Sequence, residues 1–194
     1  MIGIVDYGAG NLQSVKKAVC YLGEKTIVSA ETRQLDGCSR LILPGVGSFG
    51  AGIAALRARG LDAYLLTRVK DTPLLGICLG MQFLLAESEE EGSFTGLGLA
   101  AGKVSRFMQG KVPHVGWNGV YGLSSPLFYG IEEGAQFYFV HSYFADVSAN
   151  TIARTEYFRS FSSAVKAGNA YGVQFHPEKS GDTGLRLLRN FMRI

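Results

Sequence analysis

Hydrophobic and polar residues follow two different patterns along the chain, and the first half alternates between strand-like and helix-like segments. Four short apolar runs predict strands buried on both faces: Ile2–Val5, Thr26–Val28, Leu41–Leu43 and Pro73–Ile77. Between them, apolar residues recur every three or four positions, which predicts helices at residues 11–22 and 53–69 and from Leu79 to about residue 87. Pro44-Gly45 is expected to end the third strand. This order predicts a parallel sheet covered by helices.

The second half of the chain has an antiparallel character. Aromatic and β-branched residues gather in four runs separated by short turns, at residues 136–144, 151–158, 163–166 and 170–175. A last helix is predicted over Gly184–Met192, with Leu185, Leu188 and Met192 on one stripe. No linker, repeat or block of charge divides the chain. We therefore predict one α/β domain that covers residues 1–194.

The composition supports a packed core and excludes several classes of protein. Hydrophobic residues make up 47% and charged residues 18%, which argues against disorder, and the 26 glycines show no Gly-X-Y period. A net charge of +3 is too small to indicate nucleic-acid binding by itself. The longest segment without a charged residue, Val112–Ile131, contains prolines, glycines and an asparagine, so we expect no membrane span. No signal peptide is recognisable at the N-terminus.

The few cysteines and histidines are too scattered for a disulfide framework or a metal site. The number of cysteines is odd, at 3, and none forms a C-x-x-C pair. The 3 histidines include no pair at helical i, i+4 spacing. We therefore expect no metal and no cofactor, and we predict a protein of the reducing cytoplasm.

The pentapeptide Gly76-Ile77-Cys78-Leu79-Gly80 has the G-x-nucleophile-x-G form of a nucleophile elbow. Its glycines permit a sharp turn between an apolar strand and a helix. The turn places the Cys78 thiol beside a helix N-terminus, where backbone N–H groups favour the thiolate, and the N–H of Leu79 is placed to stabilise an oxyanion. A buried structural cysteine is the alternative for this motif alone. That alternative is preferred for Cys20 and Cys38.

A cysteine nucleophile needs a base, and the base needs a group that orients it. His176 and Glu178 are two residues apart at the end of an apolar run, so in extended backbone their side chains point the same way. A surface pair is the alternative, but His114 and His141 have no acid at that spacing. Pro44-Gly45-Val46-Gly47 follows the third strand, at the edge where parallel sheets bind ligands, and can offer backbone N–H groups to an anion.

Together these motifs resemble those of the class I glutamine amidotransferases. More narrowly, six motifs in family order are similar to those of the glutaminase subunits of imidazole glycerol phosphate synthase. They are D-Y-G-x-G-N at 6–11, L-P-G-V-G at 43–47, G-I-C-L-G-M-Q at 76–82, P-H-V-G-W-N at 113–118, Y-F-V-H-S-Y at 138–143 and G-V-Q-F-H-P-E-K-S-G at 172–181. The fourth and fifth motifs are the most specific. Val115 departs from the bulkier apolar residue expected there, which affects only packing near the glutamine pocket.

The resemblance implies a flavodoxin-like α/β fold and a glutaminase activity. Cys78 would attack the side-chain amide of glutamine and form a thioester, with His176 as general base and acid and Glu178 as the group that orients His176. The oxyanion donors implied by the family are the backbone N–H groups of Leu79 and of Val46 or Gly47. The residues implied around the glutamine are Gly47, Gln82, Glu90, His141, Ser142 and Tyr143.

The resemblance also implies a partner that consumes the ammonia. This partner is a (β/α)8-barrel cyclase, which would form a heterodimer with the chain and make imidazole glycerol phosphate and an aminoimidazole carboxamide ribonucleotide in histidine biosynthesis. The interface residues implied are Asn11, Trp117, Tyr138 and Lys179. The alternative to an interface role for Trp117 is that it is a half-buried packing residue. Two other functions stay open: a paralogous glutaminase that supplies a different synthase, and a catalytically silent binding subunit.

Overall fold

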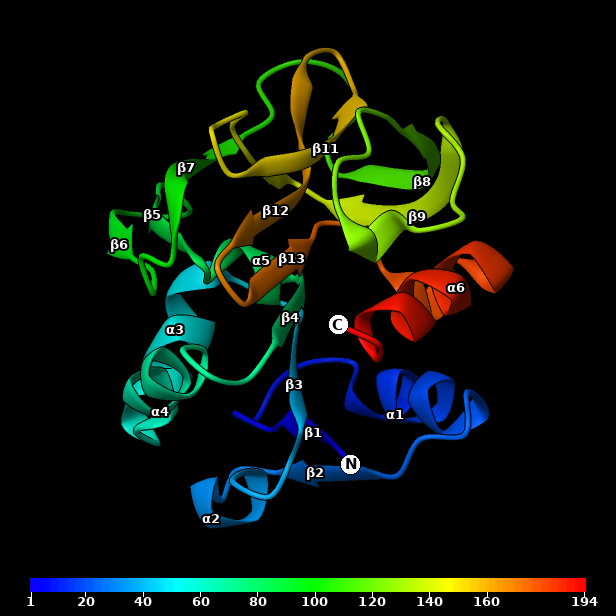
Figure 1. Cartoon of the computed structure of the whole chain (residues 1–194). Coiled ribbons are helices and arrows are strands. Elements are labelled where there is room, and N and C mark those ends of the chain that lie inside the picture. Colours follow the sequence, from blue (N-terminus) through cyan, green and yellow to red (C-terminus); the bar gives the residue numbers. More distant parts are fainter.

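One long sheet runs through the computed structural model, which describes residues 1–194 (Figure 1). Its parallel part consists of β1 (Ile2–Val5), β2 (Thr26–Ser29), β3 (Arg40–Gly45), β4 (Leu74–Cys78) and β13 (Ala170–Val173). Beyond it lie the strands β5 (Leu85–Ser88), β6 (Phe94–Thr95), β7 (Ala100–Arg106), β10 (Tyr143–Ala145), β11 (Thr151–Glu156) and β12 (Ser160–Ala167). The order is β2-β1-β3-β4-β13-β12-β10-β7-β5-β6, with β11 paired to β12.

A separate antiparallel ribbon lies beside this sheet. It consists of β8 (His114–Val120) and β9 (Ala135–His141), which pair along their whole length. Figure 1 shows the ribbon above α6, on the same side of the molecule as α1. Phe137 and Phe139 of β9 are fully buried and belong to the hydrophobic core. The ribbon is therefore packed against the body of the protein although it is not part of the main sheet.

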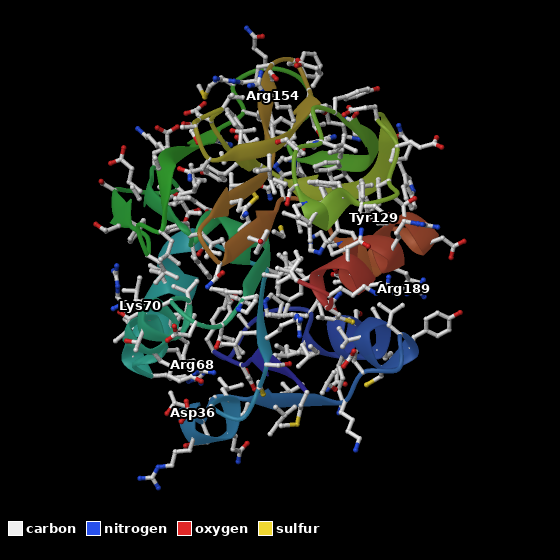
Figure 2. All side chains as sticks on the ribbon, in the orientation of Figure 1. Asp36, Arg68, Lys70, Tyr129, Arg154 and Arg189 are labelled. Atoms are coloured by element: carbon white, nitrogen blue, oxygen red, sulfur yellow. The ribbon has the colours of Figure 1, made fainter.

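Helices cover both faces of the parallel strands. On one face lie α1 (Leu12–Tyr21) and α6 (Gly181–Phe191), and on the other α2 (Thr32–Leu35), α3 (Phe49–Ala58) and α4 (Leu61–Arg68) (Figure 1). Two hydrophobic clusters fill the spaces between the layers: Val19 and Leu188 belong to the first, Leu56 and Leu65 to the second. Arg68 ties α4 to α2 by donating to the carbonyl of Asp36 at 3.3 Å (Figure 2).

The turn between β4 and the single helical turn α5 (Leu79–Gln82) depends on glycines. A Cβ on Gly80 would collide with the carbonyl of Leu43 in β3, and a Cβ on Gly76 would collide with the carbonyl of Gly80. A Cβ on Gly45 would lie 2.6 Å from the backbone nitrogen of Gly80. The first turn of α5 thus lies directly on the backbone of β3, and no side chain fits between them.

The predicted α/β fold is confirmed, with corrections to three elements. The helix expected over 53–69 is two helices, because Gly60 adopts a left-handed conformation with φ of 64° between α3 and α4. The helix expected to reach residue 87 ends at Gln82, because the chain then pairs with β7 as β5. Pro44 and Gly45 do not end the third strand, since both stay paired with β4.

The second half holds more strands than the sequence predicts. The run at 136–144 is divided at Ser142 into β9 and β10, which belong to different sheets. The run at 170–175 is antiparallel to β12 but also parallel to β4, so it closes the parallel part of the sheet. The last helix begins earlier than expected, at Gly181. No helix of this fold is long and apolar enough to cross a membrane.

The close packing of α5 on β3 yields a test of stability. Gly80→Ala should lower the free energy of unfolding by about 2–3 kcal/mol, because β3 or α5 must shift to admit the methyl group. Gly37→Ala is the matched control, since nothing lies within 4 Å of the added Cβ there. Urea unfolding measures both variants, and equal stability of the two would contradict the tight contact.

Candidate active site

Cys78 lies at the tip of a strained turn. It is the last residue of β4 and the N-cap of α5, with φ of 54° and ψ of −111°. Positive φ is uncommon in residues other than glycine, and such strain is concentrated at functional sites. The side chain is 7% exposed. The elbow predicted from the sequence is therefore present, with its thiol almost enclosed.

His176 and Glu178 reach the same edge of the sheet because β13 pairs with β4. The register places Val173 beside Ile77, so the segments after both strands leave the sheet together. His176 Nδ1 lies 2.8 Å from a carboxylate oxygen of Glu178, and the two side chains are 2% and 1% exposed. They form a buried pair rather than a surface pair. His176 Nε2 has no hydrogen-bond partner, so it is free for a proton transfer.

The charge state of His176 follows from its neighbours. Burial alone lowers the pKa of an imidazole, but Cys78 and Glu178 favour the imidazolium and together raise the pKa of His176 to about 10. Cys78 and Glu178 thus both interact with the imidazole and favour its protonated form, so Cys78 and His176 form a coupled pair. Such a pair is typical of an activated cysteine nucleophile.

A cavity of about 520 Å³ opens at Cys78 and His176. The other predicted site residues that line it are Val46, Gly47, Leu79, Gln82, Glu90, His141, Ser142, Tyr143 and Lys179. Glu178 lies behind His176 and does not line the cavity. Lining residues not predicted from the sequence are Glu91, Arg106, Pro113 and Val140. The cavity brings together residues of five motifs that are far apart in sequence.

Glu90 has a second contact besides the cavity. Its carboxylate accepts a hydrogen bond at 2.8 Å from the backbone N–H of Phe49, at the start of α3. Burial raises the pKa of Glu90, and the N–H of Phe49 counteracts this. A carboxylate that is fixed at the start of a helix keeps its position at the cavity wall.

His141 and His114 form a buried imidazole pair with defined tautomers. His141 Nδ1 lies 2.8 Å from the carbonyl oxygen of Tyr143, so it must carry a proton, and His141 Nε2 then accepts from His114 Nδ1 at 2.9 Å. His114 Nε2 faces the amide nitrogen of Asn118 at 3.3 Å. Burial lowers the pKa values of His114 and His141 to about 4 and about 3. Both imidazoles are neutral, unlike that of His176.

The sequence did not single out Gln174, whose side chain is fully buried beside Cys78. Its amide nitrogen lies 3.7 Å from the sulfur. The signal was available, since Gln174 is two residues before His176, and residues at this spacing in an extended segment share a side. Arg106 left no such signal, because it is the last residue of β7, a strand that the sequence did not predict.

The residues expected at an interface form a band that starts at Glu178. Asn11 makes a long contact of 3.5 Å to the Glu178 carboxylate. Lys179 lies over the ring of Tyr138 at 5.9 Å, and Tyr138 pairs across the ribbon with Trp117 at a ring distance of 6.1 Å. Trp117 is 56% exposed, so a large part of its ring is open to solvent in this chain.

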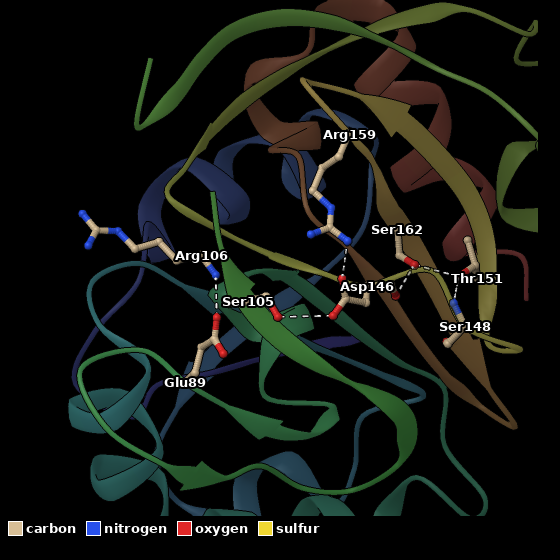
Figure 3. A network of polar contacts seen from close by, with 8 residues as sticks. All are labelled: Glu89, Ser105, Arg106, Asp146, Ser148, Thr151, Arg159 and Ser162. Atoms are coloured by element: carbon tan, nitrogen blue, oxygen red, sulfur yellow. Dashed lines mark hydrogen bonds and ion pairs between the residues drawn. The ribbon is translucent and has the colours of Figure 1, made fainter. Parts of the chain in front are cut away.

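A polar network supports the strand that carries Tyr143 (Figure 3). Asp146, directly after β10, accepts from the hydroxyl of Ser105 at 3.2 Å and pairs with Arg159 at 3.0 Å. Its backbone carbonyl accepts from Ser162 at 2.9 Å. The network joins β7, β10 and β12 beside the cavity, so the position of β10 is fixed from both neighbouring strands. No group of three or more His, Cys, Asp or Glu side chains here could hold a metal ion.

The comparison with protein families decides what kind of protein carries this site. A family model described as glutamine amidotransferase class-I matches residues 3–194. The chain belongs to the class-I glutamine amidotransferase family. This amidotransferase is 47% identical over 201 residues to the imidazole glycerol phosphate synthase subunit HisH of Chlorobium chlorochromatii, with 100% of both chains covered. It is 45% identical over 197 residues to the protein of the same name from Methanocaldococcus jannaschii, again with 100% of both covered.

Solved structures confirm the fold of this amidotransferase. A crystal structure described as a glutamine amidotransferase superposes with a TM-score of 0.79 at 21% identity, covering 99% of this chain and 97% of the other. The structure of PurLQS from Thermotoga maritima gives a TM-score of 0.77 at 19% identity, covering 99% of this chain and 97% of the matched one. At these identities the likeness concerns the fold alone.

The charge state of His176 in this amidotransferase can be tested by removing its neighbour. Cys78→Ala should lower the pKa of His176 from about 10, because one of the two groups that favour the imidazolium is lost and burial remains. NMR titration of the imidazole measures this pKa. Cys38→Ala is the matched control, since Cys38 is a buried cysteine in the other hydrophobic cluster. A pKa of His176 that is unchanged in Cys78→Ala would contradict the interaction.

The neutral imidazole pair makes stability depend on pH. Between the ordinary pKa of about 6.5 and the folded values near 4 and 3, the unfolded chain binds protons that the folded amidotransferase excludes. The contribution of this pair to stability is therefore complete above pH 6.5 and is lost as the pH falls below it. His114→Phe keeps a ring beside Tyr157, and the unfolded variant has one fewer imidazole that can bind a proton.

As the pH is lowered, the free energy of unfolding of His114→Phe should fall less steeply than that of the wild type, by about 1.4 kcal/mol per pH unit. Urea unfolding at several pH values between 6.5 and 5 measures the two slopes. Parallel slopes would show that His114 is not the buried neutral group described here.

Proposed function

We propose that the chain is the glutaminase subunit of an imidazole glycerol phosphate synthase in histidine biosynthesis. The observation that carries this proposal is the buried set of Cys78, His176 and Glu178 at the cavity, in a chain with full-length relatives of that name. The set has the nucleophile, the base and the orienting carboxylate that amide hydrolysis through a thioester needs.

In the proposed reaction the Cys78 thiolate attacks the side-chain amide carbon of glutamine. His176 Nε2 gives its proton to the departing ammonia, and a γ-glutamyl thioester remains. Nε2 then takes a proton from water as that water attacks the thioester, and the thiolate leaves with glutamate as the product. Glu178 holds Nδ1 throughout, which keeps Nε2 directed at the cavity.

The oxyanion needs backbone donors beside the sulfur. We assign the N–H of Leu79 and an N–H from Val46 or Gly47. Gly45 pairs with Cys78 across β3 and β4, so the loop that follows Gly45 begins next to the nucleophile, and this register supports the assignment. Removing one such donor typically costs about 10²–10³ in rate.

We assign the remaining cavity residues to the glutamine itself. Glu90 is the carboxylate for its α-ammonium group, and this role agrees with a position fixed by the start of α3. Gln82 donates both of its amide hydrogens to protein groups, so its oxygen is left to accept from the glutamine. The other proposed contacts are Gly47, His141, Ser142 and Tyr143.

The ammonia is passed in this proposal to a (β/α)8-barrel cyclase that forms a heterodimer with the chain. The band of Asn11, Lys179, Tyr138 and Trp117 supports a docking face beside the active site, because it begins at Glu178 and ends at an exposed aromatic ring. Aromatic residues are typical of interface centres. The free thiols of all three cysteines favour the cytoplasm as the location.

The division of labour between the two proteins gives a direct test. In the assembled enzyme, Cys78→Ala should abolish synthesis of imidazole glycerol phosphate from glutamine and spare synthesis from added ammonium salt, because only the source of ammonia is lost. Both rates are measured in parallel on the same complex.

Cys20→Ala is the control, because Cys20 is exposed on α1 and should keep both activities. Loss of the ammonium-dependent rate in the Cys78→Ala complex would contradict the proposal. A wild-type chain that never hydrolyses glutamine would indicate the silent binding protein, and a chain that fails to bind the barrel cyclase would indicate a paralogue with another synthase.

A further inference from the structure

The sulfur of Cys78 has two uncharged polar neighbours that the mechanism above does not use. The carbonyl oxygen of Val140 lies 3.9 Å away and can only accept a hydrogen bond, so it favours the protonated thiol. The side-chain amide nitrogen of Gln174 lies 3.7 Å away and can donate, so it favours the thiolate. Gln174 is 0% exposed, which removes water as a competitor for this donor.

The hydrogen-bond network fixes which end of the Gln174 amide faces the sulfur. The carbonyl of Tyr143 accepts from the amide nitrogen of Gln82 at 3.0 Å, so Gln82 must turn its NH₂ group inward. The second hydrogen of this group goes to the amide oxygen of Gln174 at 3.1 Å. Since that oxygen is used as the acceptor, the NH₂ group of Gln174 is the one left to face Cys78.

Tyr143 can set this direction because its carbonyl is held in place. It lies in β10, which the network around Asp146 joins to both neighbouring strands. His141 also donates to the same carbonyl, at 2.8 Å. The chain of contacts from Tyr143 through Gln82 and Gln174 to Cys78 therefore has one polarity, and its last member is an N–H directed at the nucleophile.

We propose that Gln174 is a further catalytic residue, whose side-chain N–H stabilises the Cys78 thiolate while Gln82 holds that N–H toward the sulfur. The inference rests on the proposed glutaminase function and adds to it. The thiolate occurs twice in that reaction, as the attacking group and as the group that leaves the thioester. A donor at the sulfur assists both steps, and Gln174 itself transfers no proton.

The alternative is that Gln174 only fills the interior and satisfies buried polar groups. Its backbone N–H donates to the carbonyl of Ser163 on β12 at 2.9 Å, so the residue has a structural contact as well. The two roles differ in one observable. Only a donor to the sulfur changes the fraction of thiolate at a given pH.

Alkylation of Cys78 by iodoacetamide measures this fraction, because the thiolate and not the thiol reacts. The rate is followed against pH on the full-length chain, and mass spectrometry of the peptide that contains Cys78 separates it from the other cysteines. Gln174→Met keeps the length of the side chain and removes the donor. The titratable groups that face the sulfur, His176 with Glu178 behind it and Tyr7 from the loop after β1, are unchanged in this variant.

The midpoint of the alkylation profile should move upward by about one pH unit in Gln174→Met, which is a roughly tenfold lower rate at pH values below the wild-type midpoint. Gln174→Leu should give the same shift, and it serves in place of the methionine variant if near-ultraviolet circular dichroism shows that one to be unfolded. The glutaminase kcat/KM should fall with it, mainly through kcat, because the donor acts on the nucleophile.

Ser163→Ala is the matched control. It changes a buried polar side chain that has no hydrogen-bond partner, on the strand segment that contacts Gln174. An unchanged midpoint in the folded Gln174 variants would overturn the inference, and so would an equal shift in Ser163→Ala. If the wild type hydrolyses no glutamine while the Gln174 variants still shift the midpoint, the proposed function fails and the contact to the thiolate stands.

Discussion

The parallel pairing of β4 with β13 is the contact on which the active site depends. It sets Ile77 beside Val173, so Cys78 and His176, the proposed nucleophile and base, leave neighbouring strands at one edge of the sheet. The two strands are separated by nearly half the chain, and neither supplies a site without the other. The glycines of the elbow serve the same pairing, because they let α5 lie against β3 without displacing β4. The same backbone pairing therefore determines both the geometry of the site and the packing of the core around it.

The three histidines differ in charge state because their electrostatic surroundings differ. All three are buried, which disfavours a charged imidazole. His176 has a carboxylate and a sulfur beside it and is protonated, whereas His114 and His141 have each other and backbone groups and stay neutral. The sequence could weigh them as candidates for the base only by the spacing of nearby acids. The structure adds that the neutral pair has a different task, since His114 donates to His141 and His141 donates to the carbonyl of Tyr143.

The sequence predicted what is local and missed what depends on distant partners. The elbow, the His-x-Glu spacing and the buried parallel strands are contiguous patterns. Cys78 and His176 do meet at the cavity, and Glu178 pairs with His176 behind it. The sequence of β5 looked like the end of a helix, because it is extended only through its pairing with the later strands β6 and β7. The spacing of Gln174 to His176 could have placed it at the site, but the direction of its amide is set by the carbonyl of Tyr143, which no local pattern links to it. The roles of the cavity residues stay predictions until they are tested.

Buried and outward-facing residues alternate along the strands of the β8–β9 ribbon. Phe137 and Phe139 are fully buried, while Tyr138 between them and Trp117 across from it face outward. If the docking face is the one proposed above, the outward residues can change in evolution to follow a changing partner while the inward ones keep the core intact. A lineage of such enzymes can therefore acquire a new docking partner through substitutions at alternate positions of one hairpin, without rebuilding the active site beneath it.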